Sequence, residues 1–418
     1  MKRAHTLYLC YFGLREPLVQ TQVLPYLREL CKADFKVSLL TFEPNPKQNW
    51  TKKEISEMHW RLAAEGINWD FLTYHKRPSA PATLFDAFCG AWYAWRKTRT
   101  EKIDVLHGRV HIPTMMAMIA KKFTFGKKPK VLFDIRGFLP EEYTEGGMWK
   151  SDGWLYHSVK KVERWLLKDS DGFVVLTEKA REVLFPESKD TGFDKWGRPV
   201  EVIPCCVDVE RFEQVDEGAR EAMRENLNLQ NRQVIVYVGS FGSNWYLPQE
   251  ITDLLGEAKQ NRPETYALIL SQTAPELIKP LLEERGFTES DYLIRKVAPI
   301  EIPLYLSVAD IAVSFIKPCY SKLASSPTKN AEYLACGLPM ITNSGIGDTA
   351  ELTRADNVGF VIDEFNTESY QMALTEIEHL LKEKTSLSLR CKRSAKERFD
   401  LETVGGASYL SIYSKLLN

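Results

Sequence analysis

The stretch SSPTKNAEYLACGLPMITNSGIGD, residues 325–348, packs helix starts, tight turns and an apolar strand into one short segment. Ser326 is a natural N-cap. Pro327 suits the first helical position, because its missing N–H would be unpaired there in any case. A short helix is therefore predicted from Thr328 to about Ala335.

The same stretch also predicts the end of that helix and the elements after it. Gly337 fits the left-handed position after a helix, and Pro339 stops the helix from continuing. A buried strand is expected over 338–343. The sequence GDTAE, residues 347–351, then predicts a second helix start with Asp348 as its cap.

Short apolar runs alternate with longer amphipathic stretches on both sides of this segment. Runs that are apolar on both faces and separated by helices are typical of parallel sheets covered on both sides. The expected strands lie at 6–12, 36–42, 104–108, 130–135, 171–177 and 200–204, and then at 234–240, 266–270, 291–297, 310–316, 338–343 and 359–363. The expected helices of the first half lie near 18–33, 51–65, 82–99, 112–122 and 154–168. The pattern predicts an α/β protein with two Rossmann-like halves joined near 205–215.

Length and composition agree with two soluble domains. The chain has 418 residues, 44% of them hydrophobic and 27% charged, and single domains cluster near 100–200 residues. The net charge of −1 gives no general attraction to nucleic acid, so no nucleic-acid partner is expected. The eight cysteines form no C-x-x-C pair and several lie in apolar runs, which favours reduced thiols and a cytoplasmic location. No apolar run is long enough to predict a membrane span.

Ligands of open parallel sheets bind beyond the carboxyl ends of the strands, so the residues after each strand are the candidate site. In the first half these residues are Gly13, Gln20, Gln22, His107, Arg109, Asp134 and Arg136. In the second half they are Gly239, Ser240 and the segment 325–348. Polar and glycine-rich residues at both sets of strand ends predict a cleft between the two domains.

The helix predicted after Pro327 suggests an anion site. A helix start just past a strand end presents free N–H groups and a positive dipole end, which suits a phosphate. Lys329 adds a charge, and Glu332 shares a helical face with Thr328, where a carboxylate can accept hydrogen bonds from ribose hydroxyls. The alternative is an ordinary i, i+3 surface ion pair between Lys329 and Glu332.

Five ordered motifs resemble one enzyme family. The segment 325–348 looks like the nucleotide-binding segment of family 4 glycosyltransferases, the retaining enzymes of GT-B fold. The other motifs are EPLVQTQVLPYLREL (16–30), FDIRGFLPEEYTEGGMW (133–149), VIPCCVDVERF (202–212) and YVGSFGSNWY (237–246). Together they cover nearly the whole chain.

The resemblance implies a domain plan: an acceptor domain at 1–205, a nucleotide-sugar donor domain at 206–398, and a helix at 399–418 that packs back toward the N-terminal domain. It also implies a donor substrate, a UDP- or GDP-sugar, with no cofactor and no metal required. The acceptor would be a carbohydrate or a lipid-linked molecule. The donor contacts implied are Gly239, Ser240, Ser325, Ser326, Thr328, Lys329, Glu332, Gly345 and Gly347.

The resemblance has three departures. Ala324 stands where the family's first glutamate usually touches the donor sugar. Ser243, Asn244 and Trp245 stand near the place where many relatives carry an arginine and a lysine. Val19 replaces a glycine common in this branch, which puts close phosphate approach at that loop in doubt.

Catalytic contacts are expected from Asp134, Arg136 and Lys329. Many relatives carry a histidine where Asp134 falls, so Asp134 and Arg136 are expected near the anomeric carbon or the leaving phosphate. The alternative is a buried Asp–Arg pair that holds two loops together. The substrate contacts implied on the acceptor side are Gly13, Gln20, Gln22, His107, Arg109 and Glu142.

Three other features have competing interpretations. His107 and His111 have a zinc-like spacing but straddle a strand end, which disfavours a metal site. Glu142 belongs to an acidic loop that either binds acceptor hydroxyls or is a solvated face. The aromatic helix over 84–95 is interpreted as core or domain packing, with a membrane-dipping surface at the inner face of the membrane as the alternative.

The sequence thus predicts retaining transfer of a sugar from a nucleotide-diphosphate sugar to a hydroxyl, in glycan or surface-polysaccharide biosynthesis. Two alternatives stay open. One is a GT-B sugar-nucleotide epimerase. The other is a catalytically inactive subunit that binds sugar nucleotides, which Ala324 and the missing basic pair favour.

Overall fold

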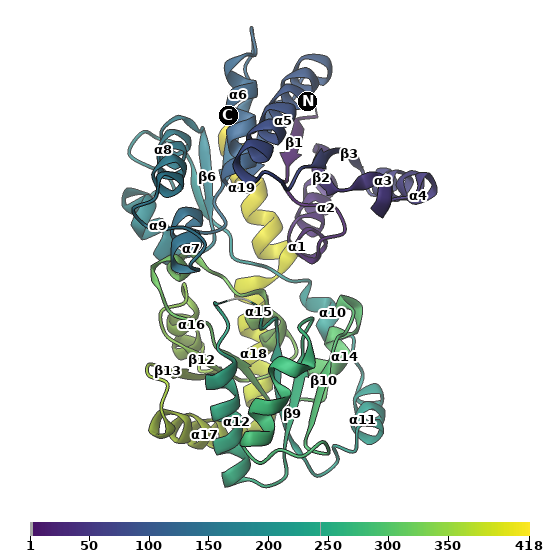
Figure 1. Cartoon of the computed structure of the whole chain (residues 1–418), viewed down its shortest axis with the longest axis vertical. Helices are drawn as coiled ribbons and strands as arrows, with labels where there is room; N and C mark the ends of the chain where they lie inside the picture. The colour runs from purple at the N-terminus through teal and green to yellow at the C-terminus, as the bar shows by residue number, and fades with distance from the viewer. Residues whose placement is uncertain (1–2, 243) are drawn as a thin grey trace. The chain divides into compact units, whose positions relative to one another are not determined.

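The computed structural model describes residues 3–242 and 244–418, so Ser243 lies outside the described residues. The chain divides into two compact units. The N-terminal unit comprises Met1–Pro204 and Val404–Asn418, and the C-terminal unit comprises Cys205–Thr403 (Figure 1). Residues 404–418 thus group with the N-terminal unit, although they are the last of the chain.

The N-terminal unit is built on a seven-stranded parallel sheet with the order β3-β2-β1-β4-β5-β6-β7. Its strands are β1 (His5–Leu9), β2 (Lys36–Pro44), β3 (Ile67–Tyr74), β4 (Val105–Arg109), β5 (Lys130–Asp134), β6 (Gly172–Val175) and β7 (Val200–Val202). Its helices are α1 (Pro17–Gln22), α2 (Leu24–Lys32), α3 (Pro46–Asn49), α4 (Lys52–Ala64), α5 (Ser79–Glu101), α6 (His111–Lys122), α7 (Leu139–Glu145), α8 (Trp154–Asp169), α9 (Glu178–Leu184) and α19 (Ala407–Leu417). Every residue of β1, β4 and β6 is buried, as expected for strands covered on both faces.

The C-terminal unit has a six-stranded parallel sheet with the order β10-β9-β8-β11-β12-β13. Its strands are β8 (Gln233–Val238), β9 (Thr265–Leu270), β10 (Tyr292–Arg295), β11 (Ile311–Ser314), β12 (Met340–Asn343) and β13 (Gly359–Ile362). Its helices are α10 (Val209–Glu213), α11 (Glu217–Asn226), α12 (Pro248–Asn261), α13 (Lys279–Glu284), α14 (Ile302–Ser307), α15 (Thr328–Ala335), α16 (Thr349–Asp356), α17 (Thr367–Leu381) and α18 (Lys384–Phe399).

Alternate residues of β8 point into two different cores of the C-terminal unit. Val234 and Val236 belong to one apolar cluster, whereas Ile235 and Tyr237 belong to another. Side chains of a strand alternate between the two faces of a sheet, so both faces of this sheet are covered. The prediction of two α/β halves with parallel sheets is confirmed.

Both sheets reverse their strand order at one place. The chain winds outward from β1 to β3 and then returns to β4 on the other side of β1. In the second sheet the same reversal falls between β8 and β11. Ligands of such folds bind beyond the carboxyl ends of the strands at this reversal. The loops after β1, β4, β8 and β11 are therefore the places where the topology favours a site.

Two details of the N-terminal unit differ from the prediction. The strand β3 was not predicted, because it lies at the edge of the sheet and most of its side chains are only partly buried, so it lacks a continuous apolar run. The single helix expected near 18–33 is two helices, broken at Val23. Pro25 lies at the start of α2, where its missing N–H cannot continue a helix from α1.

Among residues 3–242 and 244–418, no helix combines the length and the hydrophobicity that crossing a membrane requires.

The end of α15 agrees with the prediction made from Gly337. This glycine has a φ of +76°, and the N–H groups of Gly337 and Leu338 donate to the carbonyls of Leu334 and Tyr333. These two bonds form a Schellman motif, which satisfies carbonyls that the helix end leaves unpaired. A Cβ on Gly337 would lie 2.1 Å from the Oγ of Ser388 on α18.

We expect Gly337→Ala to lower the free energy of unfolding by about 1–3 kcal/mol, because it adds a clash to the cost of a left-handed alanine. Urea titration followed by circular dichroism measures this loss. Gly286→Ala is the matched control, since Gly286 has a φ of +78° and a Cβ there would meet nothing within 4 Å. Equal losses for the two variants would show that the contact with Ser388 is unimportant.

Candidate functional site

Helix α15 begins where the chain returns from β11. A 3₁₀-helix, Tyr320–Ala324, follows β11, and Pro327 then takes the N-cap position of α15 in an extended conformation. The prediction that Ser326 is the N-cap is therefore wrong. Proline itself adopts the extended cap conformation, and the Oγ of Ser326 instead accepts a hydrogen bond of 3.1 Å from the N–H of Cys205. Thr328 is the first residue of the helix, and Ser325 ends the 3₁₀-helix.

Lys329 presents a buried ammonium group. Its Nζ is buried without a hydrogen-bond partner among the described residues, and it lies 4.2 Å from the ring centroid of Tyr237 and 5.6 Å from that of Tyr246. Burial lowers the pKa of Lys329 to about 7, against the opposing effect of Glu332. The aromatic faces stabilise the cation in part. A buried cation with no anionic partner is unusual and favours a site for an anion.

Glu332 lies one turn further along α15. Burial raises the pKa of its carboxyl to about 7, although Arg211 and Lys329 act in the opposite direction. Within the described part of the chain, Glu332 and Lys329 form no ion pair. The surface ion pair considered as an alternative is therefore not what the structure has. Lys329 is the second residue of α15 and Glu332 is its fifth.

The turn after β8 approaches Lys329 closely. Gly239 has a φ of +153°, and a Cβ at this position would lie 3.2 Å from the Nζ of Lys329 and 2.8 Å from the hydroxyl of Tyr237. Only glycine allows the turn and the ammonium to come so close. Next in the chain, the Oγ of Ser240 lies 3.0 Å from Thr273 Oγ1 and accepts a bond of 3.1 Å from Gly242 N–H.

The turn after β12 packs on the segment after β11. The N–H of Gly347 donates to the carbonyl of Lys322 over 2.8 Å, and a Cβ on Gly345 would lie 3.0 Å from Pro318. Gly345 and Gly347 both have positive φ, at +81° and +43°. The C-terminal unit therefore brings together the loops after β8, β11 and β12. Asp348 takes the N-cap position of α16, as predicted.

Three residues of this region were missed in the sequence. The ammonium of Lys322 lies 4.0 Å from the ring centroid of Trp245, so a second lysine accompanies Lys329. Tyr237 and Tyr246 line Lys329. The sequence carried one signal for Tyr237. It lies two residues before Gly239, and residues two apart along a strand point to the same face. Ala324, in the position of the family's first glutamate, is buried.

In the N-terminal unit, Asp134 ends β5 and is completely buried. Its Oδ2 accepts hydrogen bonds from Arg136 Nε at 3.0 Å and from the Tyr409 hydroxyl at 3.0 Å, and it lies 3.4 Å from His107 Nε2. Burial alone would raise the pKa of Asp134, but Arg136, His107 and Arg109 outweigh it and hold the carboxyl pKa well below its usual range. Asp134 is thus an ionised carboxylate in a dense network.

Helix α19 supplies two members of the same network. The guanidinium of Arg136 donates to the hydroxyl of Tyr409 over 2.7 Å, and the hydroxyl of Tyr413 lies 2.9 Å from both Thr6 Oγ1 and His107 Nδ1. Burial lowers the pKa of His107, which favours the neutral ring. Because a carboxylate only accepts, Nε2 of a neutral His107 donates to Asp134 and Nδ1 accepts from Tyr413.

The sequence missed both tyrosines of α19, although their i, i+4 spacing places them on one helical face. In this network Asp134 and Arg136 form a buried pair, as in the alternative interpretation of these two residues. It also leaves donor capacity over: Nη1 of Arg136 and Nε of Arg109 are buried and have no hydrogen-bond partner among the described residues.

The remaining predicted residues lie at or near the carboxyl edge of the first sheet. Arg109 donates from Nη1 to the carbonyl of Gln22 over 3.3 Å, and Gln20 donates to the carbonyl of Leu14 over 2.6 Å. A Cβ on Gly13 would lie 3.0 Å from Glu43 Oε2, and a Cβ on Gly137 would lie 3.2 Å from Glu142 Oε1. Arg109 and Gln20 thus form hydrogen bonds within the N-terminal unit, and the two glycines lie close to acidic side chains of the same unit.

The zinc-like histidine pair has separate partners. His111 Nε2 lies 3.2 Å from Glu163 on α8, whereas His107 faces Asp134 and Tyr413. Across residues 3–242 and 244–418, no cluster of three or more histidine, cysteine or acidic side chains is arranged to hold a metal ion.

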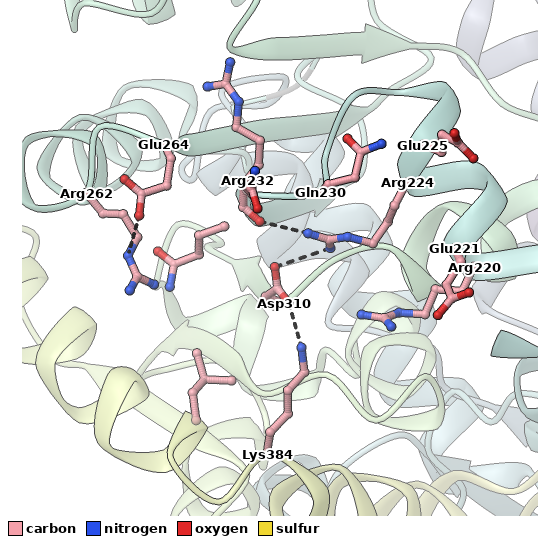
Figure 2. Close-up of a pocket in the computed structure, with 13 residues that line it drawn as sticks. Arg220, Glu221, Arg224, Glu225, Gln230, Arg232, Arg262, Glu264, Asp310 and Lys384 are labelled. Atoms are coloured by element: carbon pink, nitrogen blue, oxygen red, sulfur yellow. Dashed lines mark hydrogen bonds and ion pairs between the residues drawn. The ribbon is translucent and has the colours of Figure 1, made fainter. Parts of the chain in front are cut away.

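A cavity of about 850 Å³ lies at the opposite, amino edge of the second sheet (Figure 2). Figure 2 shows that its charged side chains meet one another: the Nζ of Lys384 donates to Asp310 over 2.9 Å, and Arg224 lies 3.6 Å from the same carboxylate. Arg262 and Glu264 also pair. The Asp310 carboxylate in this cavity thus has two cationic partners, whereas the Nζ of Lys329 has no hydrogen-bond partner among the described residues.

Comparison with known proteins agrees with this arrangement. The sequence profile of Glycosyltransferase Family 4 matches residues 19–211, and that of Glycosyl transferases group 1 matches residues 219–398. The chain belongs to the GT-B glycosyltransferases. The two matched segments follow one another along the chain and account for most of both units.

Solved structures share the fold of this glycosyltransferase along the whole chain. A glycosyltransferase from Rickettsia africae ESF-5 has a TM-score of 0.72 at 14% identity and covers 100% of both chains. Sucrose-phosphate synthase from Thermosynechococcus elongatus has a TM-score of 0.72 at 14% identity, with 99% of each chain covered. Anabaena Alr3699/HepE, solved with UDP and glucose, has a TM-score of 0.66 at 15% identity and covers 99% of this chain and 100% of its own.

One curated relative is similar in sequence. Spore coat protein SA of Bacillus subtilis (strain 168) is 24% identical over 216 residues, which are 49% of this chain and 55% of that protein. The chain thus spans about half the length of this relative.

We expect Asp134→Asn to lower the free energy of unfolding by about 3–5 kcal/mol at neutral pH, because it leaves buried guanidinium groups unpaired. The pKa of Asp134 is depressed in the folded state. Its contribution is therefore present above the pKa of an unfolded aspartate and is lost as the pH falls through the folded value. The difference between wild type and variant should accordingly shrink below about pH 4.

Urea titrations at several pH values measure both effects. Asp34→Asn is the control, because the Asp34 side chain is 84% exposed, and we expect a change within about 0.5 kcal/mol. A loss for Asp134→Asn no larger than that of the control would contradict the role given to this network.

Proposed function

We propose that the protein is a retaining glycosyltransferase that moves a sugar from a UDP- or GDP-sugar to a hydroxyl of a carbohydrate or lipid-linked acceptor. The biological setting we propose is glycan or surface-polysaccharide biosynthesis, in the cytoplasm at the inner face of the membrane. The observation that carries the proposal is the buried ammonium of Lys329 at the start of α15, which has no hydrogen-bond partner in the described part of the chain and lies beyond the strands where the second sheet reverses its order. The UDP and glucose bound by Alr3699/HepE support this choice of donor.

In the proposed step, the acceptor oxygen bonds to the anomeric carbon while the bond from that carbon to the diphosphate oxygen breaks. The bonding electrons leave with the diphosphate, and the acceptor's proton passes to a departing phosphate oxygen on the same face. Positive charge grows on the sugar and negative charge on the diphosphate. Lys329 and the free N–H groups at the start of α15 stabilise the leaving group, as fixed charges and dipoles do in active sites.

Other donor contacts follow from the same helix and the neighbouring turns. Glu332 accepts hydrogen bonds from the ribose hydroxyls. These bonds stabilise the carboxylate, which burial otherwise disfavours. Gly239, Ser240, Gly345 and Gly347 let the backbone approach the phosphates and sugar. Lys322 supplies a second positive charge, because it lies on Trp245 of the same loop that places Tyr246 near Lys329.

On the acceptor side we propose a role for Arg136 that is supported by its spare donor. Nη1 of Arg136 is buried and unpartnered among the described residues, and an ionised Asp134 holds the guanidinium in place. Arg136 and Arg109 then contact oxygen atoms of the substrates, and Asp134 acts as a positioning residue. Gly13, Gln20, Gln22, His107 and Glu142 shape the surroundings of the acceptor.

A second candidate function is a subunit that binds a sugar nucleotide without turning it over. Ala324 favours this candidate, because a buried methyl group cannot replace a glutamate that touches the donor sugar. Turnover separates the two functions. Release of nucleotide diphosphate and transfer of sugar to an acceptor mixture occur only with the transferase, and the configuration of the product's anomeric carbon then tests retention.

The first experiment is a thermal-shift screen with UDP, GDP, ADP and CMP and their common sugars, with and without EDTA. We expect one nucleoside diphosphate to raise the Tm by mass action, with no effect of EDTA. The variant Lys329→Met should abolish most of that shift, whereas Lys396→Met, an exposed position on α18, should keep it. A wild-type protein that no nucleotide stabilises and that transfers no sugar would contradict the proposal.

Nucleotide affinity should also depend on pH. The pKa of Lys329 is about 7 in the free protein, and a bound diphosphate stabilises the ammonium and raises this pKa. Binding therefore takes up a proton, and affinity falls as the pH rises above the free value. In Glu332→Gln, which removes the second group whose pKa burial moves to about 7, the decrease should approach about tenfold per pH unit for one coupled proton.

Titration calorimetry at several pH values checks this coupling. A terminal phosphate of pKa about 6 is already ionised in this range and does not contribute. Lys329→Met should bind more weakly and without the decrease in affinity at rising pH. A steep profile that persists in Lys329→Met would assign the proton to another group.

A further inference from the structure

Helix α5 has its small residues inside and its large residues outside. The buried positions are mostly small, with Ala82, Ala87, Gly90, Ala91, Ala94 and Thr98. Leu84, Phe85, Phe88 and Trp92 have exposed fractions of 64%, 55%, 68% and 51%. At 3.6 residues per turn these four lie within about 100° of one another around the helix axis. The aromatic helix is therefore not core packing within the N-terminal unit, contrary to the favoured interpretation of its sequence.

The orientation of α5 is fixed by its inner face. It packs against α6, with which it lies side by side in Figure 1. A Cβ on Gly90 would lie 2.5 Å from the Sδ of Met116 on α6, so the two helices approach closely at this glycine. Turning the large side chains inward would require the same space. The packing of α5 on α6 therefore keeps the large apolar side chains of α5 exposed.

The apolar surface continues onto the end of α6. The indole N–H of Trp95 donates to the carbonyl of Phe123 over 3.0 Å, which joins α5 to the segment after α6. Phe123 and Phe125 have exposed fractions of 59% and 89%. We call the set Leu84, Phe85, Phe88, Trp92, Phe123 and Phe125 the aromatic patch. A patch of this kind on a soluble protein marks an interaction site.

The charges around the aromatic patch have one sign. Arg96 and Arg99 continue the outer face of α5, with guanidinium carbons 5.7 Å from the Trp92 ring centroid and 5.1 Å from that of Trp95. Neither arginine forms an ion pair among the described residues. Lys122 and Lys128 are exposed beside Phe123 and Phe125.

Acidic groups near the patch are engaged elsewhere. Asp86, on the inner face of α5, is 1% exposed and accepts hydrogen bonds from Tyr11 and His75. Glu101 pairs with Lys97, and Asp104 pairs with Lys127. The segment 119–130 contains no acidic residue. The surface is therefore apolar in its centre and basic at its border.

We propose that the aromatic patch docks the protein onto an anionic phospholipid bilayer, with α5 lying in the plane of the interface. Aromatic and leucine side chains on one face with flanking arginine and lysine are what an interfacial helix uses, since the rings enter the headgroup layer and the cations meet lipid phosphates.

A second copy of the chain fits less well, because a two-fold contact would bring two basic borders together. The inference does not depend on sugar transfer. Its consequence for a lipid-linked acceptor does rest on the proposed function.

The test is flotation of the full chain with vesicles of equal parts phosphatidylglycerol and phosphatidylcholine, and with phosphatidylcholine alone. We expect binding to the anionic vesicles, weaker binding to the neutral ones, and release as salt is added. The double variant Phe88→Ser with Trp92→Ser should reduce binding by about tenfold or more, because it removes two of the rings that enter the bilayer. Arg96→Ala with Arg99→Ala should reduce the preference for anionic vesicles.

The matched control is Trp60→Ser on α4, a tryptophan that is 77% exposed and outside the patch. It should bind vesicles as wild type does. All variants should keep the wild-type Tm and nucleotide-induced shift, so that failure of the membrane proposal is distinguished from failure of the donor site. The proposal is overturned if wild type ignores anionic vesicles or if the patch variants bind as well as wild type. A dimer in solution that the double variant converts to monomers, without vesicle binding, would instead assign the patch to a second copy.

Discussion

Parallel strands constrain everything else in this molecule. Each strand of both sheets must be reached by a crossover through a helix, so all carboxyl ends of a sheet meet at one edge. Loops and helix starts gather at that edge whatever their sequence. Where the strand order reverses, the two adjacent crossovers run in opposite directions and leave a crevice in which ligands bind. Gly239, the two lysines Lys322 and Lys329, and Gly347 follow three different strands, and they become neighbours only because β8, β11 and β12 are parallel. The chemistry of the second unit is therefore a consequence of its topology.

The two units handle buried charge in opposite ways. Asp134 is surrounded by donors from β4, from the loop after β5 and from α19, so its charge is compensated within the fold. Lys329 lies against aromatic rings and pairs with no anion among the residues that the structure describes, and burial lowers its pKa to about 7. Removing a partner from a compensated buried charge destabilises a fold strongly, whereas an uncompensated charge raises the free energy of the fold until a partner arrives. The contrast explains why a buried charge in a sequence motif does not by itself indicate catalysis.

The sequence predicted the periodic features well and the long-range ones poorly. Buried strands and the end of α15 at Gly337 are local, because they depend on apolar runs and on a left-handed glycine. The edge strand β3 was missed because partial burial removes the apolar run. Ser326 was assigned to the wrong position because proline can cap a helix itself. The tyrosines of α19 and the cation Lys322 could not be found, since their partners lie distant in the chain and only the fold brings them together. The outward face of α5 needed the packing of Gly90 on Met116 to be recognised.

The placement of α19 has a consequence for how the protein is made. The hydroxyls of Thr6 and Tyr413 meet although 407 residues separate them. During synthesis on the ribosome the first sheet emerges early, yet the phenols that complete the Asp134 network emerge only after the whole C-terminal unit. The C-terminal unit is one continuous stretch and is able to fold as soon as it is complete. The N-terminal unit must hold an unfinished charged interior in the meantime, and contacts of such long range form slowly. The N-terminal unit therefore cannot reach its final structure before residues 404–418 have been synthesised.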